Sequence, residues 1–166
     1  MFYYTEYNSM LGKLTIASDE ENIVGLWIEG QKYFGYPILS QAIRRTNIHV
    51  LNKAKNWLDR YFNREKPDIS ELPLKPIGSD FRQLVWKELC KIPYGEVVTY
   101  GEIAKQIAQK ENKKTMSAQA IGGAVGHNPI AIIIPCHRVV GVNGSLTGYA
   151  GGIDKKEKLL KFEREF

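Results

Sequence analysis

Residues 117–139 read SAQAIGGAVGHNPIAIIIPCHRV, and this stretch decides the organisation of the second half of the chain. Ser117 can cap a helix of small residues over Ala118–Val125. The β-branched run Ile132–Ile134 then predicts a strand that stops at Pro135, because proline cannot donate to a strand ladder. The sequence thus predicts a helix, a turn and a strand whose end presents a cysteine beside a histidine.

Two further helices are expected before this stretch. Amphipathic spacing over Phe81–Ile92 predicts the first, which Pro93-Tyr94-Gly95 would close. Thr99-Tyr100-Gly101-Glu102 has the spacing of a capping box, so the second begins near Tyr100. A helix, a turn, a helix, a strand and a hairpin at Asn143-Gly144 follow the order of a winged helix-turn-helix.

The first half of the chain reads as a small α+β unit. Alternating and then continuous apolar residues over 13–28, interrupted by a polar turn, predict a β-hairpin. Helical spacing of apolar residues follows over His49–Phe62. Prolines punctuate residues 67–76 and predict a linker, and a last helix capped by Asp154 is expected near the C-terminus. The expected domains are residues 1–77 and 78–166.

The composition is typical of a globular protein, because 43% of the 166 residues are hydrophobic and 25% are charged. No apolar run is long enough to cross a bilayer, and Met1–Glu6 lacks the layout of a signal peptide. Two cysteines, Cys90 and Cys136, suit a reducing compartment. No pattern predicts dimerisation. We therefore expect a cytoplasmic monomer with no membrane partner.

Positive charge lies mainly on the C-terminal half. Residues 1–78 carry a net charge of +1 and residues 79–166 a net charge of +4. This excess suits a polyanionic partner such as DNA, although a solvated basic surface is an equally common interpretation. The helix predicted at Ala118–Val125 contains two glycines, which each cost about 1 kcal/mol of helix stability. Either DNA or a neighbouring helix therefore approaches its backbone closely, and the sequence leaves both open.

Cys136 is the candidate nucleophile. A thiol at a strand end beside His137, with Glu163 of the last helix within reach, forms a cysteine–histidine–carboxylate set that lowers the thiol pKa and orients the imidazole. Cys90 lies in a predicted helix beside Trp86, and we expect it to fill the core. The two cysteines and three histidines show no paired metal-ligand spacing, so no metal site is expected.

Four segments of the second half carry a recognisable pattern: residues 93–100 (PYGEVVTY), 118–129, 135–140 (PCHRVV) and 148–152 (GYAGG). Their order and spacing resemble the O6-alkylguanine-DNA alkyltransferases over nearly all of residues 79–163. The resemblance implies a C-terminal winged helix-turn-helix domain after a small ribonuclease-H-like α/β domain. It also implies an activity, the transfer of an alkyl group from O6 of guanine, or O4 of thymine, in double-stranded DNA to Cys136.

The resemblance further assigns roles around the cysteine. His137 would act on the thiol through a water, with Glu163 fixing the imidazole. Tyr100 would protonate N3 of the leaving guanine, and Asn128 would brace the cysteine turn. Backbone groups of Cys136, Val139 and Ala150 would read the base. Tyr149 would wall the pocket, and Lys156 matches a lysine of the family that bonds the tyrosine hydroxyl.

The resemblance also implies that the target base is flipped out of the duplex. Flipping costs a few kcal/mol and less at a damaged pair. The family inserts an arginine from the second helix into the vacated stack, whereas this chain has Gln119. Glutamine is shorter and uncharged, but it can still hydrogen-bond the orphan base. The DNA-contacting residues implied in this way are Thr99, Ser117, Ala118, Gln119, Ala120, Gly122 and Gly123.

The chemistry predicts a single turnover. An S-methyl thioether has no good leaving group, and no cofactor motif here could remove the methyl, so each molecule would react once and need no cofactor. Three alternatives remain. A lesion sensor would lack the cysteine, a winged-helix regulator would not need a cysteine–histidine pair, and a cysteine hydrolase would turn over repeatedly.

Overall fold

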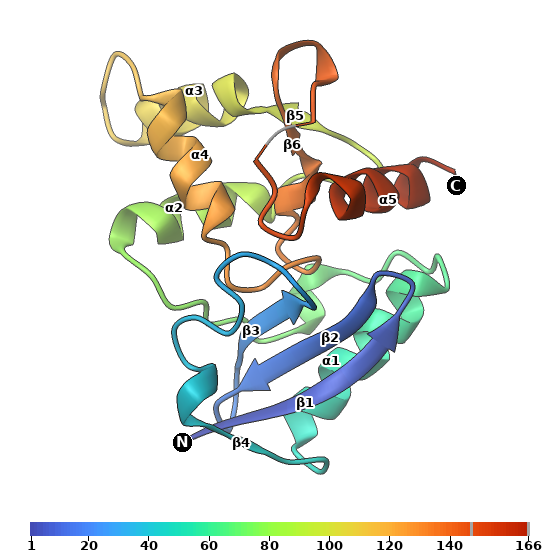
Figure 1. Cartoon of the computed structure of the whole chain (residues 1–166). Coiled ribbons are helices and arrows are strands. Elements are labelled where there is room, and N and C mark those ends of the chain that lie inside the picture. Colours follow the sequence, from blue (N-terminus) through green and yellow to red (C-terminus); the bar gives the residue numbers. More distant parts are fainter. Residues whose placement is uncertain (147, 166) are drawn as a thin grey trace. The chain divides into compact units, whose positions relative to one another are not determined.

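The computed structural model describes residues 1–146 and 148–165. The chain folds into two compact units, which Figure 1 colours along the sequence. The first unit holds residues 1–77 together with 129–133, and the second holds 78–128 and the described residues from 134 onward. Both units contain helices and strands, so the predicted α+β class is confirmed.

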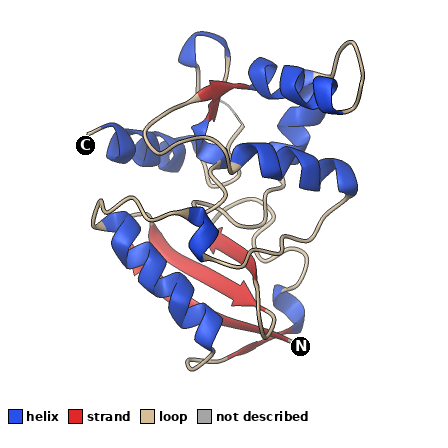
Figure 2. Ribbon diagram, turned by 180° about the vertical axis from the view of Figure 1, so that it is seen from behind, coloured by secondary structure: helices blue, strands red, loops and turns tan. Residues whose placement is uncertain are grey.

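A four-stranded sheet in the order β3-β2-β1-β4 forms the first unit. Strands β1 (Phe2–Ser9), β2 (Gly12–Ser18) and β3 (Ile23–Ile28) pair antiparallel, and β4 (Ala42–Arg44) lies parallel to β1. Helix α1 (His49–Phe62) contacts the first three strands and runs along the sheet in Figure 2. The predicted hairpin and the predicted helix are both confirmed.

Helix α1 is stable because its apolar residues recur on one face. Leu51, Ala54 and Leu58 are at most 1% exposed, and burial of each leucine contributes about 2 kcal/mol. Trp57 is also buried, and its indole Nε1 donates to the carbonyl oxygen of Asp68 at 2.9 Å. This bond fastens the chain that follows α1 onto the helix.

Two backbone segments cover the outer edge of β3. Ile23 donates to the Pro73 carbonyl at 2.7 Å and accepts from Lys75 N–H at 2.8 Å, so part of the predicted linker is paired with the sheet. Leu26 donates to the Pro129 carbonyl at 2.8 Å and accepts from Ala131 N–H at 2.9 Å. An edge covered in this way offers no free strand to another chain.

The strand predicted over Ile132–Ile134 is wrong. Only the bridge between Leu26 and Ile130 has strand pairing, and the following residues form turns. Ile132 has a φ of +69°, which is unusual for a β-branched residue, and Ile133 N–H donates to the Ala131 carbonyl at 2.8 Å. All three isoleucines are at most 1% exposed, so the apolar run reflects burial and not strand geometry.

The described part of the second unit contains four α-helices, a two-stranded parallel ribbon and two short 3-10 segments. The helices are α2 (Asp80–Leu89), α3 (Tyr100–Lys110), α4 (Ala118–Gly126) and α5 (Ile153–Arg164), and the strands are β5 (Val98–Thr99) and β6 (Val139–Val140). Helices α2, α3 and α4 contact one another. The hydroxyls of Thr99 and Ser117 cap α3 and α4 by accepting from Glu102 N–H and Ala120 N–H. These starts confirm the predicted helix-turn-helix.

Two details of the second unit differ from the sequence-based expectation. Asn143-Gly144 does not close a hairpin, because Val142–Gly144 is a 3-10 turn and β6 pairs in parallel with β5. Asp154 does not cap α5. The N-cap is Gly152 at a φ of +101°, and Asp154 lies in the first turn, where a carboxylate interacts favourably with the helix dipole. Among the described residues, no helix has the length and apolar character needed to cross a membrane.

Candidate active site

Cys136 begins a 3-10 helix, Cys136–Arg138, and does not stand at a strand end. Its backbone N–H donates to the Ile134 carbonyl at 2.8 Å, which closes a turn around Pro135. The same carbonyl accepts from Asn128 Nδ2 at 2.9 Å, so Asn128 is placed where the sequence led us to expect a brace. Cys136 is 5% exposed. Two hydrogen bonds to one carbonyl thus fix a nearly buried thiol.

His137 and Glu163 form a buried pair. The imidazole Nε2 lies 2.7 Å from Glu163 Oε2, and the two residues are 0% and 2% exposed. A carboxylate only accepts hydrogen bonds when it is ionised, so Nε2 is the donor and a neutral imidazole has its lone pair on Nδ1. Nδ1 is buried and has no hydrogen-bond partner among the described residues. The ring therefore presents an open acceptor.

Arg138 binds the same carboxylate, which the sequence did not indicate. Its Nε donates to Glu163 Oε1 at 2.8 Å, Nη2 donates to Oε2 at 3.1 Å, and Nη1 donates to the Ile92 carbonyl at 2.7 Å. Gly95 N–H also donates to Oε1 at 3.3 Å. From the sequence, bonds from Arg138 to backbone carbonyls are favoured over contact with phosphate. The bond to Ile92 is of this kind, and the pairing with Glu163 was not predicted.

Burial and charge set the protonation states. Burial opposes ionisation of Glu163, but hydrogen bonds and charges from His137 and Arg138 outweigh it and lower the pKa of Glu163. Burial lowers the pKa of His137 below its ordinary value, although Glu163 acts in the opposite direction. The lowered thiol pKa expected from the sequence is not found, because burial raises the pKa of Cys136 and is only partly offset by hydrogen bonding from Asn128 and by the charge of Lys156. The resting site at neutral pH therefore holds a thiol, a neutral imidazole and a carboxylate.

Lys156 reaches the site from α5. It is fully buried, and its Nζ donates to the Val139 carbonyl at 2.5 Å and lies 5.7 Å from the centre of the Tyr100 ring. Burial lowers the pKa of Lys156, while the nearby Cys136 raises it. Val139 N–H donates to the Cys136 carbonyl, so both backbone groups of Val139 have partners within the protein.

A glycine lies against the Tyr100 hydroxyl, and a second tyrosine follows it in the chain. A Cβ on Gly148 would lie 3.4 Å from the Tyr100 hydroxyl oxygen, which places the residue 148–150 loop against the phenol. Tyr149 is 9% exposed, and its hydroxyl is buried without a hydrogen-bond partner among the described residues. Burial raises the pKa of Tyr149 well above its ordinary value. Ala150 follows it and is half-buried.

The glycines and the first alanines of α4 face open space, whereas Ala124 is buried. A Cβ added at Gly122 or Gly123 would meet no atom within 4 Å, and Gln119 beside them is exposed, as are Ala118 and Ala120. Packing of a neighbouring helix against these glycines is therefore excluded within the described residues. Of the two interpretations of these glycines, packing against a neighbouring helix and close approach of DNA, the described structure is compatible with the second.

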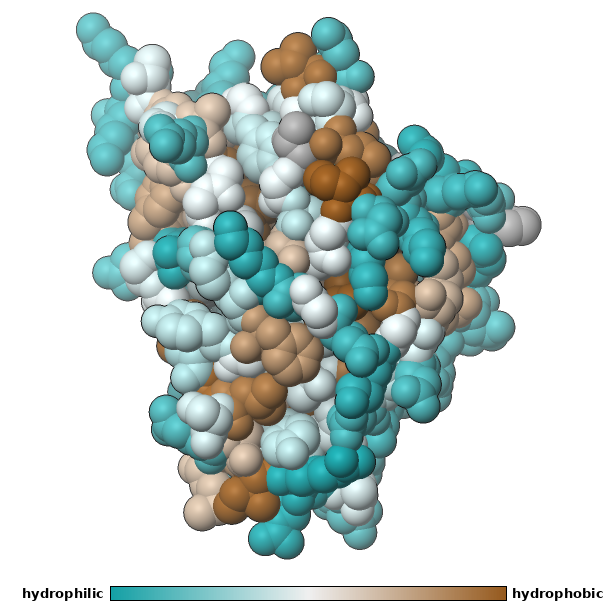
Figure 3. All heavy atoms as spheres, in the orientation of Figure 1, coloured by the Kyte–Doolittle hydropathy of each residue, from teal (hydrophilic) through white to brown (hydrophobic). Residues whose placement is uncertain are grey.

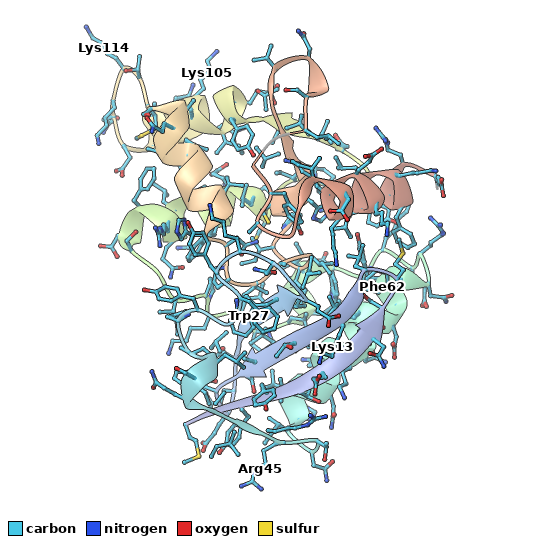
Figure 4. The ribbon with its side chains drawn as sticks, viewed as in Figure 1. Lys13, Trp27, Arg45, Phe62, Lys105 and Lys114 are labelled. Atoms are coloured by element: carbon cyan, nitrogen blue, oxygen red, sulfur yellow. The ribbon has the colours of Figure 1, made fainter. Side chains whose placement is uncertain are left out.

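Lysines surround the loop before α4. Lys105 on α3, together with Lys113 and Lys114, borders a hollow of about 380 Å³, and the labelled Lys105 and Lys114 project outward in Figure 4. Figure 3 shows hydrophilic side chains around this loop. Lys110, in contrast, pairs with the buried carboxylate of Glu88. The basic surface beside α4 is thus carried by the three other lysines.

Comparison with known proteins agrees with this geometry. Residues 80–165 match the family model for the DNA-binding domain of 6-O-methylguanine DNA methyltransferase, and residues 2–76 match its ribonuclease-like domain. A methylated-DNA–protein-cysteine methyltransferase from Haemophilus influenzae is 43% identical over 162 residues, which cover 98% of this chain and 86% of that protein. One from Methanosarcina acetivorans is 41% identical, with 97% of each protein covered.

A solved structure shares the fold. The crystal structure of Mycobacterium tuberculosis OGT in complex with DNA matches with a TM-score of 0.83 and 39% identity, covering 98% of this chain and 93% of that chain. The two family matches together take in most of the chain, including the cysteine turn and the helix-turn-helix. The chain therefore belongs to the 6-O-methylguanine DNA methyltransferase family.

Proposed function

We propose that this protein repairs double-stranded DNA by moving an alkyl group from O6 of guanine, or O4 of thymine, onto Cys136 in a single irreversible turnover without a cofactor. The observation that carries the proposal is the fixed, nearly buried thiol next to a His137–Glu163 pair whose Nδ1 is open. A thiol is a poor nucleophile until it loses its proton, and a neutral imidazole is a suitable base.

The transfer step balances without a further reactant. The Cys136 proton passes to His137 Nδ1 through a water, the sulfur–carbon bond forms, and the carbon–O6 bond breaks. Tyr100 donates its phenolic proton to N3 of the leaving guanine, and the proton held by His137 restores the phenol. The net change is one alkyl group exchanged for one thiol hydrogen. Asn128 and the Cys136 and His137 amides favour the thiolate during the step.

The remaining site residues bind the base. Tyr149 walls the pocket, and the Ala150 backbone and the second lone pair of the Val139 carbonyl read the edge of the guanine. The Val139 carbonyl already accepts from Lys156, so Lys156 fixes this part of the pocket and lies over the Tyr100 ring that must reach N3. The base enters by rotation out of the duplex, which is how enzymes reach an atom inside a base stack.

Helix α4 meets the DNA in this proposal. Its open glycine backbone permits close approach to the duplex, and Gln119 stands beside the vacated stack. Thr99 and Ser117 lie at the starts of α3 and α4, where backbone amides attract phosphate. The full set of proposed DNA contacts is Thr99, Ser117, Ala118, Gln119, Ala120, Gly122 and Gly123.

The domain boundaries and the cellular setting are part of the same proposal. Residues 1–77 form the ribonuclease-like domain, and residues 78–166 form the alkyl-accepting domain. Both cysteines are free, and an acceptor thiol must stay reduced, which favours the cytoplasm. The protein acts as a monomer, because one molecule holds the complete cysteine–histidine–glutamate set.

The test is mass spectrometry of the intact protein and its peptides after incubation with duplex DNA that carries one O6-methylguanine. We expect one methyl group per protein on the peptide with Cys136, and none in Cys136→Ser. Cys90→Ser is the matched control, because this half-buried thiol has a pKa raised to about 11 by burial and should not matter. Tight lesion binding without a mass gain would indicate a sensor, and repeated turnover would indicate a hydrolase.

A further inference from the structure

The buried guanidinium of Arg138 has no part in the transfer chemistry described above. Arg138 is 6% exposed, and three of its nitrogens donate to Glu163 and the Ile92 carbonyl at 2.7–3.1 Å. Its Cζ also lies 5.7 Å from the centre of the Tyr94 ring. Such two-pronged arginine–carboxylate pairs are among the stronger hydrogen bonds in proteins. Glu163 thus has a complete counter-charge before His137 is considered.

The positive charge of Arg138 determines whether the His137 imidazole is protonated. A buried carboxylate without a cation favours a protonated imidazole beside it, because an isolated charge in a protein interior is costly. With Arg138 in place, the carboxylate and the guanidinium already neutralise each other. A proton on His137 would then add a net positive charge to a fully buried ring.

The other groups near His137 either lower its pKa, as Arg138 does, or carry no charge. Lys156 from α5 is a second buried cation, and its charge, like that of Arg138, lowers the pKa of His137. Cys136, in the same turn, rests as a thiol because burial raises its pKa. Tyr149 rests as a neutral phenol, since burial raises its pKa well above the ordinary value. Glu163 is thus the anion that favours imidazolium, and Arg138 holds that anion.

We propose that Arg138 is a positioning residue that holds Glu163 as a carboxylate for two donors at once and thereby keeps His137 a neutral base, with Nε2–H on Glu163 and an unprotonated Nδ1. For catalysis, this inference rests on the proposed transfer to Cys136. The state of the imidazole itself can be measured without DNA and without transfer.

The first experiment follows the His137 imidazole by nitrogen and carbon NMR of the unmodified protein from pH 5 to 9. The signal is assigned with His137→Gln, which removes it and leaves those of His49 and His127. We expect a neutral ring with the proton on Nε2 at pH 7. An imidazolium at pH 7, or a ring with its proton on Nδ1, would overturn the proposal whatever the protein does to DNA.

The second experiment removes the counter-charge. In Arg138→Gln we expect the His137 pKa to rise by at least about one unit, which lowers the neutral fraction about tenfold where the pH lies below the original pKa. The rate of methyl transfer should then fall most at acidic pH and recover as the pH rises. A lower rate with an unchanged pH profile would contradict the proposal and indicate a purely structural role.

Two further variants control this experiment. Arg138→Lys keeps the charge with fewer donors, so the His137 pKa should stay near its original value. Arg164→Gln removes a charge from the exposed side of the same helix α5 and should change neither the pKa nor the profile. If Arg138→Gln does not fold, the lysine variant and the NMR of the unmodified protein still decide the question. Absence of methyl on Cys136, by contrast, would contradict only the proposed function.

Discussion

Replacing Asn128 by alanine tests how the cysteine turn is held. Asn128 is 5% exposed, and its Nδ2 donates to the Ile134 carbonyl at 2.9 Å, the same oxygen that accepts from Cys136 N–H. The substitution removes one of these two donors, and the space left by the amide is buried. It also removes a group that favours the Cys136 thiolate. Both stability and thiol reactivity should therefore fall.

The size of the effect follows from the bond that is lost. Loss of a buried hydrogen bond that leaves its partner unsatisfied costs about 1–3 kcal/mol. The Ile134 carbonyl keeps its bond from Cys136 N–H, so we expect the middle of this range, about 2 kcal/mol. For a chain of this length, that corresponds to a fall in Tm of about 4–8 °C.

The assay combines urea unfolding with single-turnover methyl transfer. Asn128→Ala should unfold at lower urea concentration and transfer more slowly, and Asn52→Ala, on the exposed face of α1, should match the original protein in both. The reasoning would be refuted by an Asn128→Ala protein with unchanged unfolding and unchanged transfer. Lower stability at an unchanged rate would show that the bond serves the fold and not the thiol.

Three further predictions concern DNA binding, the pocket and pH. Gln119→Arg should tighten binding to duplex DNA and steepen its salt dependence by about 0.9 in log–log slope for one added phosphate contact, whereas Gln106→Arg on α3 should do less; anisotropy titrations that give equal slopes and affinities would count against a role for position 119. Tyr149→Phe removes a buried hydroxyl without a partner among the described residues, so its urea midpoint should stay or rise, and a loss above about 1 kcal/mol would mean that the hydroxyl is bonded. Because the folded pKa of His137 is lowered from 6.5, its contribution to stability is present above pH 6.5 and is lost as the pH falls through the folded value; His137→Gln should flatten that part of the stability curve, and an unflattened curve would argue against a buried neutral ring.

The sequence predicted the elements whose local signals and burial agree. Helix α1 has the predicted bounds, His49–Phe62, because its apolar spacing coincides with the face that it buries. The starts of α3 and α4 follow from the hydroxyls of Thr99 and Ser117, which bond their own helices and need no distant partner. Local chemistry of this kind is visible in sequence.

The errors lie where distant contacts decide the backbone. Ile132–Ile134 was predicted to be a strand because isoleucine is β-branched. In the structure, backbone pairing with Leu26 ends at Ala131, and the chain then turns so that the Ile134 carbonyl accepts from the Asn128 side chain. Asn143-Gly144 has the residues of a two-residue hairpin turn. It does not form one, because β6 pairs with β5 and not with a strand after the turn. Neither partner is adjacent in sequence, so neither outcome could be predicted from local pattern.

The candidate site was predicted in part. The pairing of His137 with Glu163 was expected from the resemblance, and the two atoms lie 2.7 Å apart. The pairing of Arg138 with that carboxylate was not predicted, because the sequence favoured bonds to backbone carbonyls, with contact to phosphate as the alternative. Burial decides between these roles, and burial of a single charged side chain is not readable from its neighbours in sequence.

The pairing of Pro129–Ala131 with β3 means that this chain cannot be divided by a single cut. A fragment that begins at Gly78 would retain residues 129–133 but lose the strand that they bond, leaving Ile130, Ile132 and Ile133, each at most 1% exposed, without cover. A fragment that ends at Ile77 would in turn bare the edge of β3. The first unit is therefore completed by five residues from the second half of the sequence, so a single cut at the boundary leaves its sheet unfinished.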